Sequence, residues 1–361
     1  MARFHDGGAE MRRLHEASMR ARKPWVDAAQ TPFRDDALMD GPPSCTAADF
    51  ELPRLRRCPL DAGDLVWGPR LGEGLDGCVW KVWFGDAGPF VLKLFWDNGP
   101  PEFAHYYAAQ RECQVAALLQ MMETAVEQAV AASRPILINA NPTTWDDALD
   151  NQAAFSDEAR MTQQSATQQE PEPGYRHITS TPRMKRCYGW LTLDSSAFSE
   201  LPWQLRPPVT KVGKVERFIQ PDKEYTAIVY EYVEEGENAV EAVQESMDFF
   251  WLAGFGFTLS PLEKNWKSGM LVDLSDIVPP RSYGWNQRLY GQDSALLLLG
   301  RDPEPGQQGF LTFRRRPPRK TQPPHRPTRP GARVGRPRPV LAERRHRSQT
   351  PRRGESTVSS N

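Results

Sequence analysis

The chain has 361 residues, 33 of them proline, and a formal net charge of −1. This length allows one sizeable folded domain, and the composition predicts unstructured flanks in place of a second packed domain. The five cysteines are odd in number and include no CxxC pair, which argues against a zinc site or a disulfide framework and predicts a reducing compartment. Even the apolar run Ala295–Leu299 is too short to cross a membrane, and the first residues lack a hydrophobic signal region. We therefore expect no membrane association.

The charge is distributed very unevenly along the chain. Residues 314–353 contain 15 lysines and arginines and one acid, Glu343, so the rest of the chain carries a formal net charge of −15. An acidic body joined to a polycationic tail predicts a polyanion as the partner of the tail.

The first predicted elements are strands that follow a polar leader. Residues 1–62 mix charges with Pro and Gly, and we expect them to be disordered. Residues 70–84 predict a strand, a glycine-rich turn and a second strand, and residues 90–96 predict a third strand that is apolar on both faces except for one lysine. Residues 106–130 predict a helix, because Ala, Leu, Gln, Glu and Met dominate them.

Two further strands are predicted beside polar inserts. The inserts cover about 139–180 and 198–222, and the strands cover residues 187–193 and 225–233.

The C-terminal part of the body is short. Residues 239–257 predict a helix, and residues 269–277 predict a short strand after a turn. From residue 301 onward Arg and Pro dominate, which predicts a disordered basic tail. The sequence thus predicts one α+β domain over residues 63–300, with an antiparallel sheet, one long helix and a reduced helical part.

The glycine-rich turn is the first candidate site. Gly72, Gly74 and Gly77 lack the Cβ atoms that would keep a phosphate chain away from the backbone amides. The turn joins two strands and does not lead into a helix, which excludes a dinucleotide-binding fingerprint. An ordinary hairpin turn is the alternative interpretation.

Lys93 is the second candidate. It interrupts the apolar strand Phe90–Trp96, and a lysine in that position needs an anion or a shifted pKa. Glu112 shares a helical face with Ala109 and Ala116, and an acid on an apolar stripe is costly unless it is paired. We therefore predict a Lys93–Glu112 ion pair. The alternatives are a lysine that reaches solvent from an edge strand, and a glutamate exposed beside Arg111.

Together these residues resemble the N-lobe of the protein kinase family. The segment Gly72–Val79 matches the family's G-x-G-x-x-G-x-V loop, Val91-Leu92-Lys93 is similar to its V-A-I-K strand, and the spacing from Lys93 to Glu112 is similar to that of the family's Lys–Glu pair. The segment Ile228–Val233 resembles the last N-lobe strand and the hinge. The resemblance implies ATP as a ligand, with its adenine between Leu71, Val79 and Val91, and against the hinge backbone from Glu231 to Val233.

The C-terminal half resembles the kinase pattern less closely. Asn265 and Asp273 correspond to the two positions that bind Mg²⁺ in the family, with Asp276 as an alternative to Asp273. Ser260 stands where the family has its catalytic Asp, and Leu274-Ser275 replaces Phe-Gly. Either Asp248 or Glu263 could supply the missing acid.

The missing acid and the short C-lobe favour a pseudokinase scaffold that binds nucleotide. About forty residues separate Asp273 from the basic tail, too few for the family's peptide-substrate platform. An atypical active kinase is the alternative.

Within kinase-like proteins, the chain is similar to a fungal inner-kinetochore subunit family of Fta type that has a kinase-like core. The similarity covers roughly residues 65–278, and four runs carry it: Leu71–Gly74, Leu92–Phe95, Arg186–Leu191 and Asn265–Ser275. Ser260 departs from that family, where an acid is usual. Membership implies a centromere role and kinetochore subunits as partners.

The tail has features of a DNA-binding segment and of a nuclear protein. Arg336 and Arg338 lie in Gly-Arg-Pro-Arg-Pro, which resembles the core of an AT-hook, whose arginines reach the floor of a narrow A·T minor groove. Clusters such as Arg314-Arg315-Arg316 suit nuclear import, and Thr350-Pro351 resembles a proline-directed phosphorylation site. A generic basic tail that binds any polyanion is the alternative.

Overall fold

The computed structural model describes residues 28–100, 106–163, 171–212, 215–259 and 261–301. These residues belong to one compact unit. Ser260 and every tail residue that the sequence analysis singled out, among them Arg314, Arg336, Arg338 and Thr350, lie outside the described ranges.

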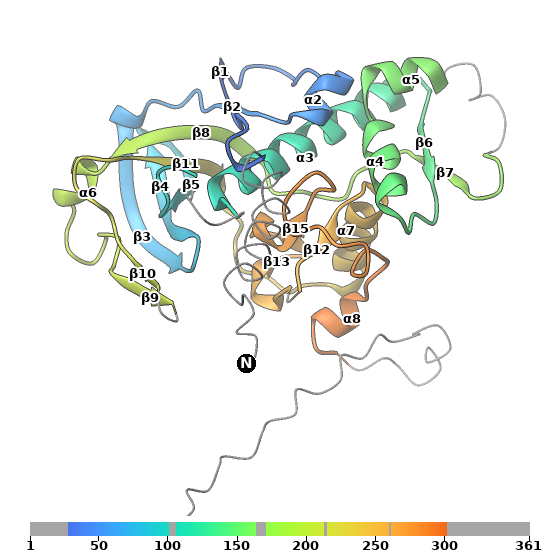
Figure 1. The fold of residues 1–361 in the computed structure, drawn as a ribbon. Helices are drawn as coiled ribbons and strands as arrows, with labels where there is room; N and C mark the ends of the chain where they lie inside the picture. Colours follow the sequence, from blue (N-terminus) through green and yellow to red (C-terminus); the bar gives the residue numbers. More distant parts are fainter. Residues whose placement is uncertain (1–27, 101–105, 164–170, 213–214, 260, 302–361) are drawn as a thin grey trace, which may run out of the picture. The chain divides into compact units, whose positions relative to one another are not determined.

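A mixed sheet is the largest feature of this α+β fold (Figure 1). In the described residues it has seven strands, in the order β1-β2-β8-β11-β5-β4-β3. The strands are β1 (Arg34–Leu38), β2 (Leu55–Arg57), β3 (Leu65–Glu73), β4 (Gly77–Phe84), β5 (Ala87–Phe95), β8 (Cys187–Asp194) and β11 (Glu224–Glu231). All neighbours are antiparallel except β1–β2 and β2–β8, which are parallel.

The three strands β3, β4 and β5 and the two strands β8 and β11 agree with the sequence prediction. In β4, buried Trp80, Val82 and Phe84 alternate with half-buried residues, which is the period of a strand with one face on a core. In β5, residues 92–95 are buried on both faces, as expected for a strand that has β4 on one side and β11 on the other.

The prediction of a disordered leader is wrong for residues 28–62. This segment supplies β1, β2, helix α2 (Ala47–Glu51) and the single 3₁₀ turn η1 (Ala62–Asp64). Phe33, Cys45 and Phe50 are buried in the main core, and Leu55 has no exposed surface. Its apolar residues are scattered irregularly among charged and polar ones, so the segment has no regular period, and packing against the rest of the domain orders it.

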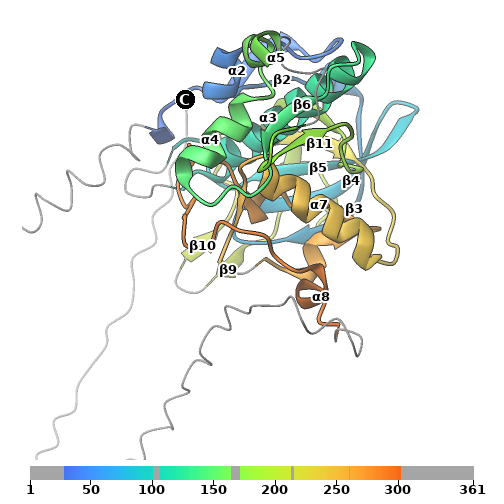
Figure 2. The same cartoon turned by 90° about the vertical axis from the view of Figure 1, so that its right-hand side faces the viewer.

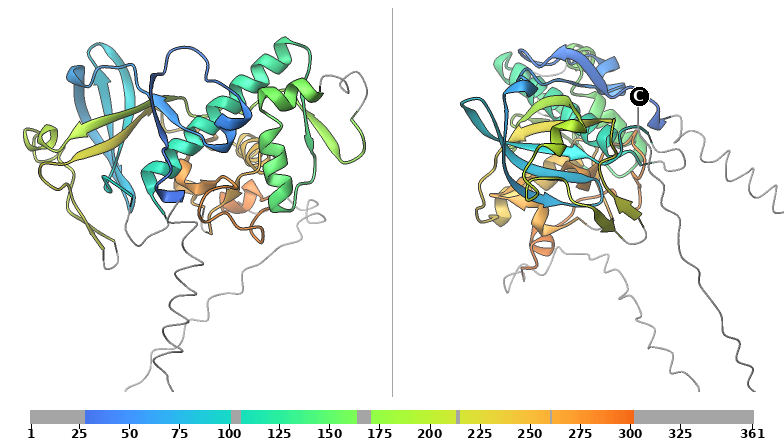
Figure 3. Two further views of the ribbon diagram at one scale, coloured as in Figure 1. Left: turned by 45° about the horizontal axis from the view of Figure 1, so that its top comes forward. Right: turned by 90° about the vertical axis from the view of Figure 1, so that its left-hand side faces the viewer.

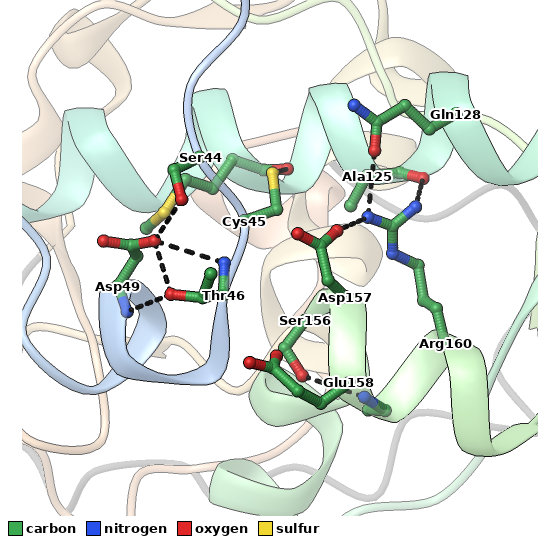
Figure 4. A network of polar contacts seen from close by, with 12 residues as sticks. Ser44, Cys45, Thr46, Asp49, Ala125, Gln128, Ser156, Asp157, Glu158 and Arg160 are labelled. Atoms are coloured by element: carbon green, nitrogen blue, oxygen red, sulfur yellow. Dashed lines mark hydrogen bonds and ion pairs between the residues drawn. The ribbon is translucent and has the colours of Figure 1, made fainter.

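Polar contacts fasten this N-terminal segment to the rest of the domain (Figure 4). Thr46 caps α2 in a reciprocal capping box with Asp49. The Ala47 amide donates to Glu158 Oε2 at 2.7 Å, and the Asp157 amide donates to the Cys45 carbonyl at 2.8 Å. These bonds hold the segment to helix α5 (Asp157–Gln163), whose Arg160 in turn donates to carbonyl and amide oxygens of helix α3 (Ala108–Ala131).

Helix α3 is the long helix that the composition predicted, and it is buried on most sides. The sheet lies at one end of it, and helices α4 (Trp145–Ala153) and α5 lie at the other (Figures 1 and 3). Its small and aliphatic residues therefore pack against several layers, which is why it has no continuous polar face.

The two predicted inserts contain regular structure in their described parts. The first holds helix α4 (Trp145–Ala153), helix α5 and the antiparallel hairpin of β6 (Ile136–Asn139) with β7 (Tyr175–Ile178). The second holds helix α6 (Ser196–Ser199) and the hairpin of β9 (Thr210–Val212) with β10 (Val215–Arg217). The polar composition concealed α4, although Thr144 and Asp147 form a capping box at its start.

The C-terminal part is built from short pieces. Helix α7 (Val240–Leu252) lies beside α4, where Asn151 Nδ2 donates to the Leu252 carbonyl at 2.9 Å (Figure 2). Two short antiparallel strand pairs follow: β12 (Gly256–Phe257) with β15 (Ile277–Val278), and β13 (Trp266–Lys267) with β14 (Met270–Leu271). The 3₁₀ turns η2 (Glu263–Asn265) and η3 (Leu274–Asp276) lie on either side of the β13–β14 pair, and the short helix α8 (Ala295–Leu298) is the last element of the described chain. Within the described ranges, no helix is long and apolar enough to cross a membrane.

The buried N-terminal segment makes a stability prediction. Replacing Leu55, which is fully buried in β2, by alanine should lower the free energy of unfolding by about 2–5 kcal/mol, because it removes core contacts and leaves a cavity. Leu38→Ala in β1 is the matched control, since Leu38 is 55% exposed and its loss should change stability by less than about 0.5 kcal/mol. Denaturant unfolding measures both. Equal stability of the two variants would mean that this segment does not pack as described.

Candidate functional site

Lys93 is the centre of the candidate site. It lies in β5, where Val79 of β4 and Ile228 of β11 are its neighbours in register, so it cannot be an edge-strand lysine. Its side chain is 10% exposed, and its Nζ donates to Glu112 Oε2 at 2.5 Å and to Asp273 Oδ1 at 2.8 Å. The predicted Lys93–Glu112 ion pair is therefore confirmed, and Asp273 joins it.

The charges of this cluster stabilise one another. Burial alone would lower the pKa of Lys93, but Asp273 and Glu112 outweigh burial and raise that pKa. Burial raises the pKa of Glu112, and Lys93 opposes the shift. Asp273 is partly buried, which alone would raise its pKa, but Lys93 and the Ser275 hydrogen bonds lower that pKa strongly. The amine is thus held as a cation between two carboxylates.

Two residues that sequence reasoning did not single out complete the cluster. Tyr230, at the end of β11, donates its hydroxyl to Glu112 Oε1 at 3.0 Å. Lys185, which precedes β8, donates to the Val272 carbonyl at 2.6 Å, and its Nζ lies 3.4 Å from the centroid of the Tyr230 ring. Since Val272 precedes Asp273 in the chain, the contacts form a closed circuit.

Lys185 makes the cluster electrically neutral, with two lysines and two carboxylates. Burial lowers the pKa of Lys185 to about 8, and Lys93 adds to this effect while Glu112 and Asp273 oppose it. In the sequence, Lys185 stands between Met184 and Arg186 in a basic run that is typical of a solvated surface. Its environment comes from segments distant in sequence, so no local pattern marks it.

The two residues predicted to bind metal do not bond to each other. Asn265 Nδ2 donates to Asp276 Oδ2 at 2.9 Å, and the Leu262 amide donates to the same oxygen at 3.2 Å. Asp276 is 6% exposed, and burial raises its pKa. The side chain of Asp273 is 35% exposed, so it is the more accessible of the two aspartates. In the described part of the chain, no three His, Cys, Asp or Glu side chains gather as a metal cluster.

The glycine-rich turn is closed by its own hydrogen bonds. The Gly74 amide donates to the Gly77 carbonyl at 2.9 Å, and Trp96 Nε1 donates to the Gly74 carbonyl at 2.9 Å. A Cβ on Gly77 would lie 1.9 Å from the Leu94 carbonyl oxygen, so β4 needs glycine there to pack on β5. A Cβ on Gly72 or Gly74 would meet no atom within 4 Å. The space above the turn is therefore open at these two residues.

The predicted adenine-binding residues lie on the strands that surround Lys93. Leu71 is 45% exposed on β3, and Val79 and Val91 are half-buried on β4 and β5. The Glu231 carboxylate accepts a hydrogen bond from the Arg186 amide at 2.8 Å and pairs with Arg183 at 2.6 Å. The Glu231 amide donates to the Arg186 carbonyl at 2.9 Å, and Val233 is 9% exposed. Glu231 thus binds the segment before β8 through both its side chain and its amide.

Neither proposed substitute for the missing acid joins the Lys93 cluster in the described structure. Asp248 lies on α7 and accepts hydrogen bonds from Gln244 and Gln292, each at 2.9 Å. Glu263 is exposed in η2.

Comparison with known proteins found no family model, no curated protein and no solved structure that matches this chain.

The unusual position of Lys185 makes a pH prediction. Because its folded pKa of about 8 is below the unfolded value of about 10.4, the native state loses this proton first as pH rises. Between pH 8 and about 10.4 the unfolded state binds more protons, so the wild type should gain stability relative to Lys185→Met by up to about 1.4 kcal/mol per pH unit. Denaturant unfolding of both proteins across this range measures the difference, in which other titrations cancel. If the free energies of unfolding of the two proteins changed with pH in parallel, Lys185 would not have the lowered pKa described above.

Proposed function

We propose that residues 63–300 form a protein-kinase-like domain that binds nucleotide and acts as a pseudokinase scaffold. The observation that carries this proposal is Lys93 bridging Glu112 and Asp273. In protein kinases, a strand lysine paired with a helix glutamate, and a metal-binding Asp beside them, must all be in place for phosphoryl transfer. In this chain the three residues lie on a strand, a helix and a late turn, in the same order as in the kinase pattern.

The order of elements also supports a kinase-like domain. The glycine-rich turn joins β3 to β4, the lysine lies on β5, and the glutamate lies on the following long helix. The predicted hinge strand β11 pairs directly with β5. Asn265 and Asp273 flank the β13–β14 hairpin. The same sequence of features is the basis of the kinase resemblance.

The residues near Asp273 suit Mg²⁺ bound with a nucleotide. Proteins hold Mg²⁺ through one or two carboxylates together with substrate phosphates, so a dense acidic cluster is not required. Asp273 accepts its hydrogen bonds from Lys93 and Ser275 through Oδ1. Asp273 and Asn265 are the residues that would hold the ion. The bound ion would neutralise phosphate charge.

The glycine-rich turn fits a nucleotide less well. The Gly74 amide already donates to Gly77, and Trp96 holds the Gly74 carbonyl, so that amide becomes available to a phosphate only if the turn opens. Tyr106 also holds the turn, because its hydroxyl donates to Asp76 Oδ2 at 2.7 Å. We therefore expect nucleotide binding to loosen these three contacts.

A scaffold is favoured over an active kinase because of position 260. A serine hydroxyl is a far weaker base than a carboxylate at neutral pH, and loss of general-base help typically costs about 10²–10⁴ in rate. Asp248 already accepts two hydrogen bonds from glutamine side chains, which makes it a poor substitute.

Thermal unfolding with and without MgATP tests nucleotide binding. A ligand at 100 times its Kd should stabilise the native state by about 2.7 kcal/mol and raise Tm accordingly. Lys93→Met should abolish the shift, because the phosphates lose their cation, whereas Lys211→Met, an exposed lysine on β9, should keep it. Absence of any shift in the wild type at millimolar MgATP would refute nucleotide binding.

Transfer of labelled phosphate separates the scaffold from the enzyme. We expect no transfer by the wild type. Transfer that is lost in Lys93→Met and kept in Lys211→Met would instead identify an atypical active kinase.

A nuclear scaffold at the kinetochore is the cellular role we propose for this domain. The support is the resemblance of residues 65–278 to the Fta-type family, together with the clusters suited to nuclear import. Kinetochore subunits are then the proposed protein partners.

DNA binding by the tail is a second candidate function, and the charge distribution favours it. Residues 314–353 carry 15 lysines and arginines and one acid. We infer that Arg336 and Arg338 give the tail a preference for A·T-rich duplexes.

Two double substitutions test this preference. Replacing Arg336 and Arg338 by alanine should lower the salt slope of binding by about 2 and remove the preference for A·T-rich over G·C-rich DNA. Replacing Arg352 and Arg353 should lower the salt slope equally and keep the preference. Fluorescence anisotropy with both duplexes measures these effects. Identical behaviour of the two variants would show a generic basic tail.

A further inference from the structure

A cavity of about 210 Å³ lies apart from the Lys93 cluster. Five segments line it: residues 28–31, residues 50–53, residues 106–118 at the start of α3, Gln152 of α4, and residues 279–283 after β15. Arg111 and Glu112 are adjacent on α3, but Arg111 lines this cavity, whereas Glu112 contacts Lys93.

Arg111 is a cation at this cavity that makes no ion pair with an acid in the described part of the chain, although the charge of Asp76 acts on it from a distance. Its guanidinium lies 4.2 Å from the centroid of the Tyr106 ring and donates to the Tyr283 carbonyl. Gly284 packs close to the guanidinium of Arg111. A Cβ atom at position 284 would lie only 3.2 Å from Nη2, so a side chain there would crowd the arginine. Burial lowers the pKa of Arg111, so an anion that reached it would relieve a real electrostatic cost.

A second arginine at the cavity is only loosely paired. Arg281 Nη2 lies 3.9 Å from Glu51 Oε1, and both side chains are well exposed. Such an ion pair contributes little to stability, so Arg281 can turn to a ligand at small cost. Glu51 is the one carboxylate among the described lining residues, which leaves the lining with an excess of positive charge.

The cavity also contains a buried hydrogen-bond donor that lacks a partner. Gln152 of α4 lines the cavity and is 3% exposed, and its Nε2 has no hydrogen bond from the described residues. A buried amide nitrogen without an acceptor costs about 1–3 kcal/mol, and an acceptor on a bound molecule would remove that cost.

We propose that this cavity is a binding site for a carboxylate group. The two guanidiniums offer only donors and Gln152 adds an unpartnered amide N–H, and a carboxylate is the acceptor that matches the planar fork of arginine. The volume equals that of about seven waters, which suits a short carboxylic acid or a single Asp or Glu side chain. This proposal does not depend on nucleotide binding at Lys93.

Titration of the full-length chain with matched probes tests this site. Glutarate represents a free acid, and an acetylated, amidated Gly-Glu-Gly peptide represents an acidic side chain. Glutaramide and the Gly-Gln-Gly peptide are the neutral controls. Saturation-transfer NMR should detect at least one acid and neither amide. Binding of the peptide alone would assign the site to an acidic protein segment, and binding of glutarate alone would assign it to a small molecule.

Substitutions locate the binding in this cavity. Arg281→Gln, at an exposed position that folding tolerates, and Arg111→Gln should each weaken acid binding by about tenfold or more, because each removes a charged hydrogen bond. Arg57→Gln, an exposed arginine on β2, should leave it unchanged. The proposal is wrong if neither acid binds the wild type at millimolar concentration, if the amides bind equally well, or if Arg281→Gln and Arg57→Gln behave alike.

Discussion

A buried amine governs the architecture of this domain. Lys93 occupies the middle of a sheet, and two carboxylates must reach it from α3 and from the turn after β14 if its charge is to be tolerated. Tyr230 contacts Glu112, and Lys185 contacts both the Tyr230 ring and the carbonyl of Val272, the residue before Asp273. The circuit joins five segments of the chain that are distant in sequence. Removal of either carboxylate would leave Lys93 with one acid in place of two, so the charges favour the state in which all five segments are packed together.

The parts of this circuit that the sequence predicted are those with a local signature. Lys93 is conspicuous because its strand is otherwise apolar, and Glu112 because its helical neighbours are small and apolar. Lys185 has no such signature, because a basic residue among other basic residues is typical of an exposed surface. Its burial follows from Tyr230 and Val272, which are far away in the chain. Local patterns thus locate a buried charge only where its immediate neighbours are apolar.

The parts of the fold that the sequence predicted also have a local signature, and the missed parts lack one. Strands β3, β4, β5, β8 and β11 and helix α3 have long periodic or apolar runs, and the sequence predicted them. Strands β1 and β2 have 5 and 3 residues and pair in parallel with distant segments, so too few residues show a period. Helix α4 is polar outside, but its capping box, Thr144 with Asp147, was readable in the sequence. Burial of single residues such as Leu55 was not.

The glycine motif is weaker support for a nucleotide than the charges are. Gly77 is required for packing, because any Cβ would collide with the Leu94 carbonyl whether or not a phosphate binds nearby. Gly72 and Gly74 face open space, so packing gives no reason for them, and they remain the two glycines that a ligand would explain. The packing of an ordinary hairpin therefore accounts for one of the three glycines, Gly77, without a ligand. No comparable packing reason exists for placing a lysine between two acids inside a sheet, and the nucleotide proposal accordingly depends on Lys93, Glu112 and Asp273.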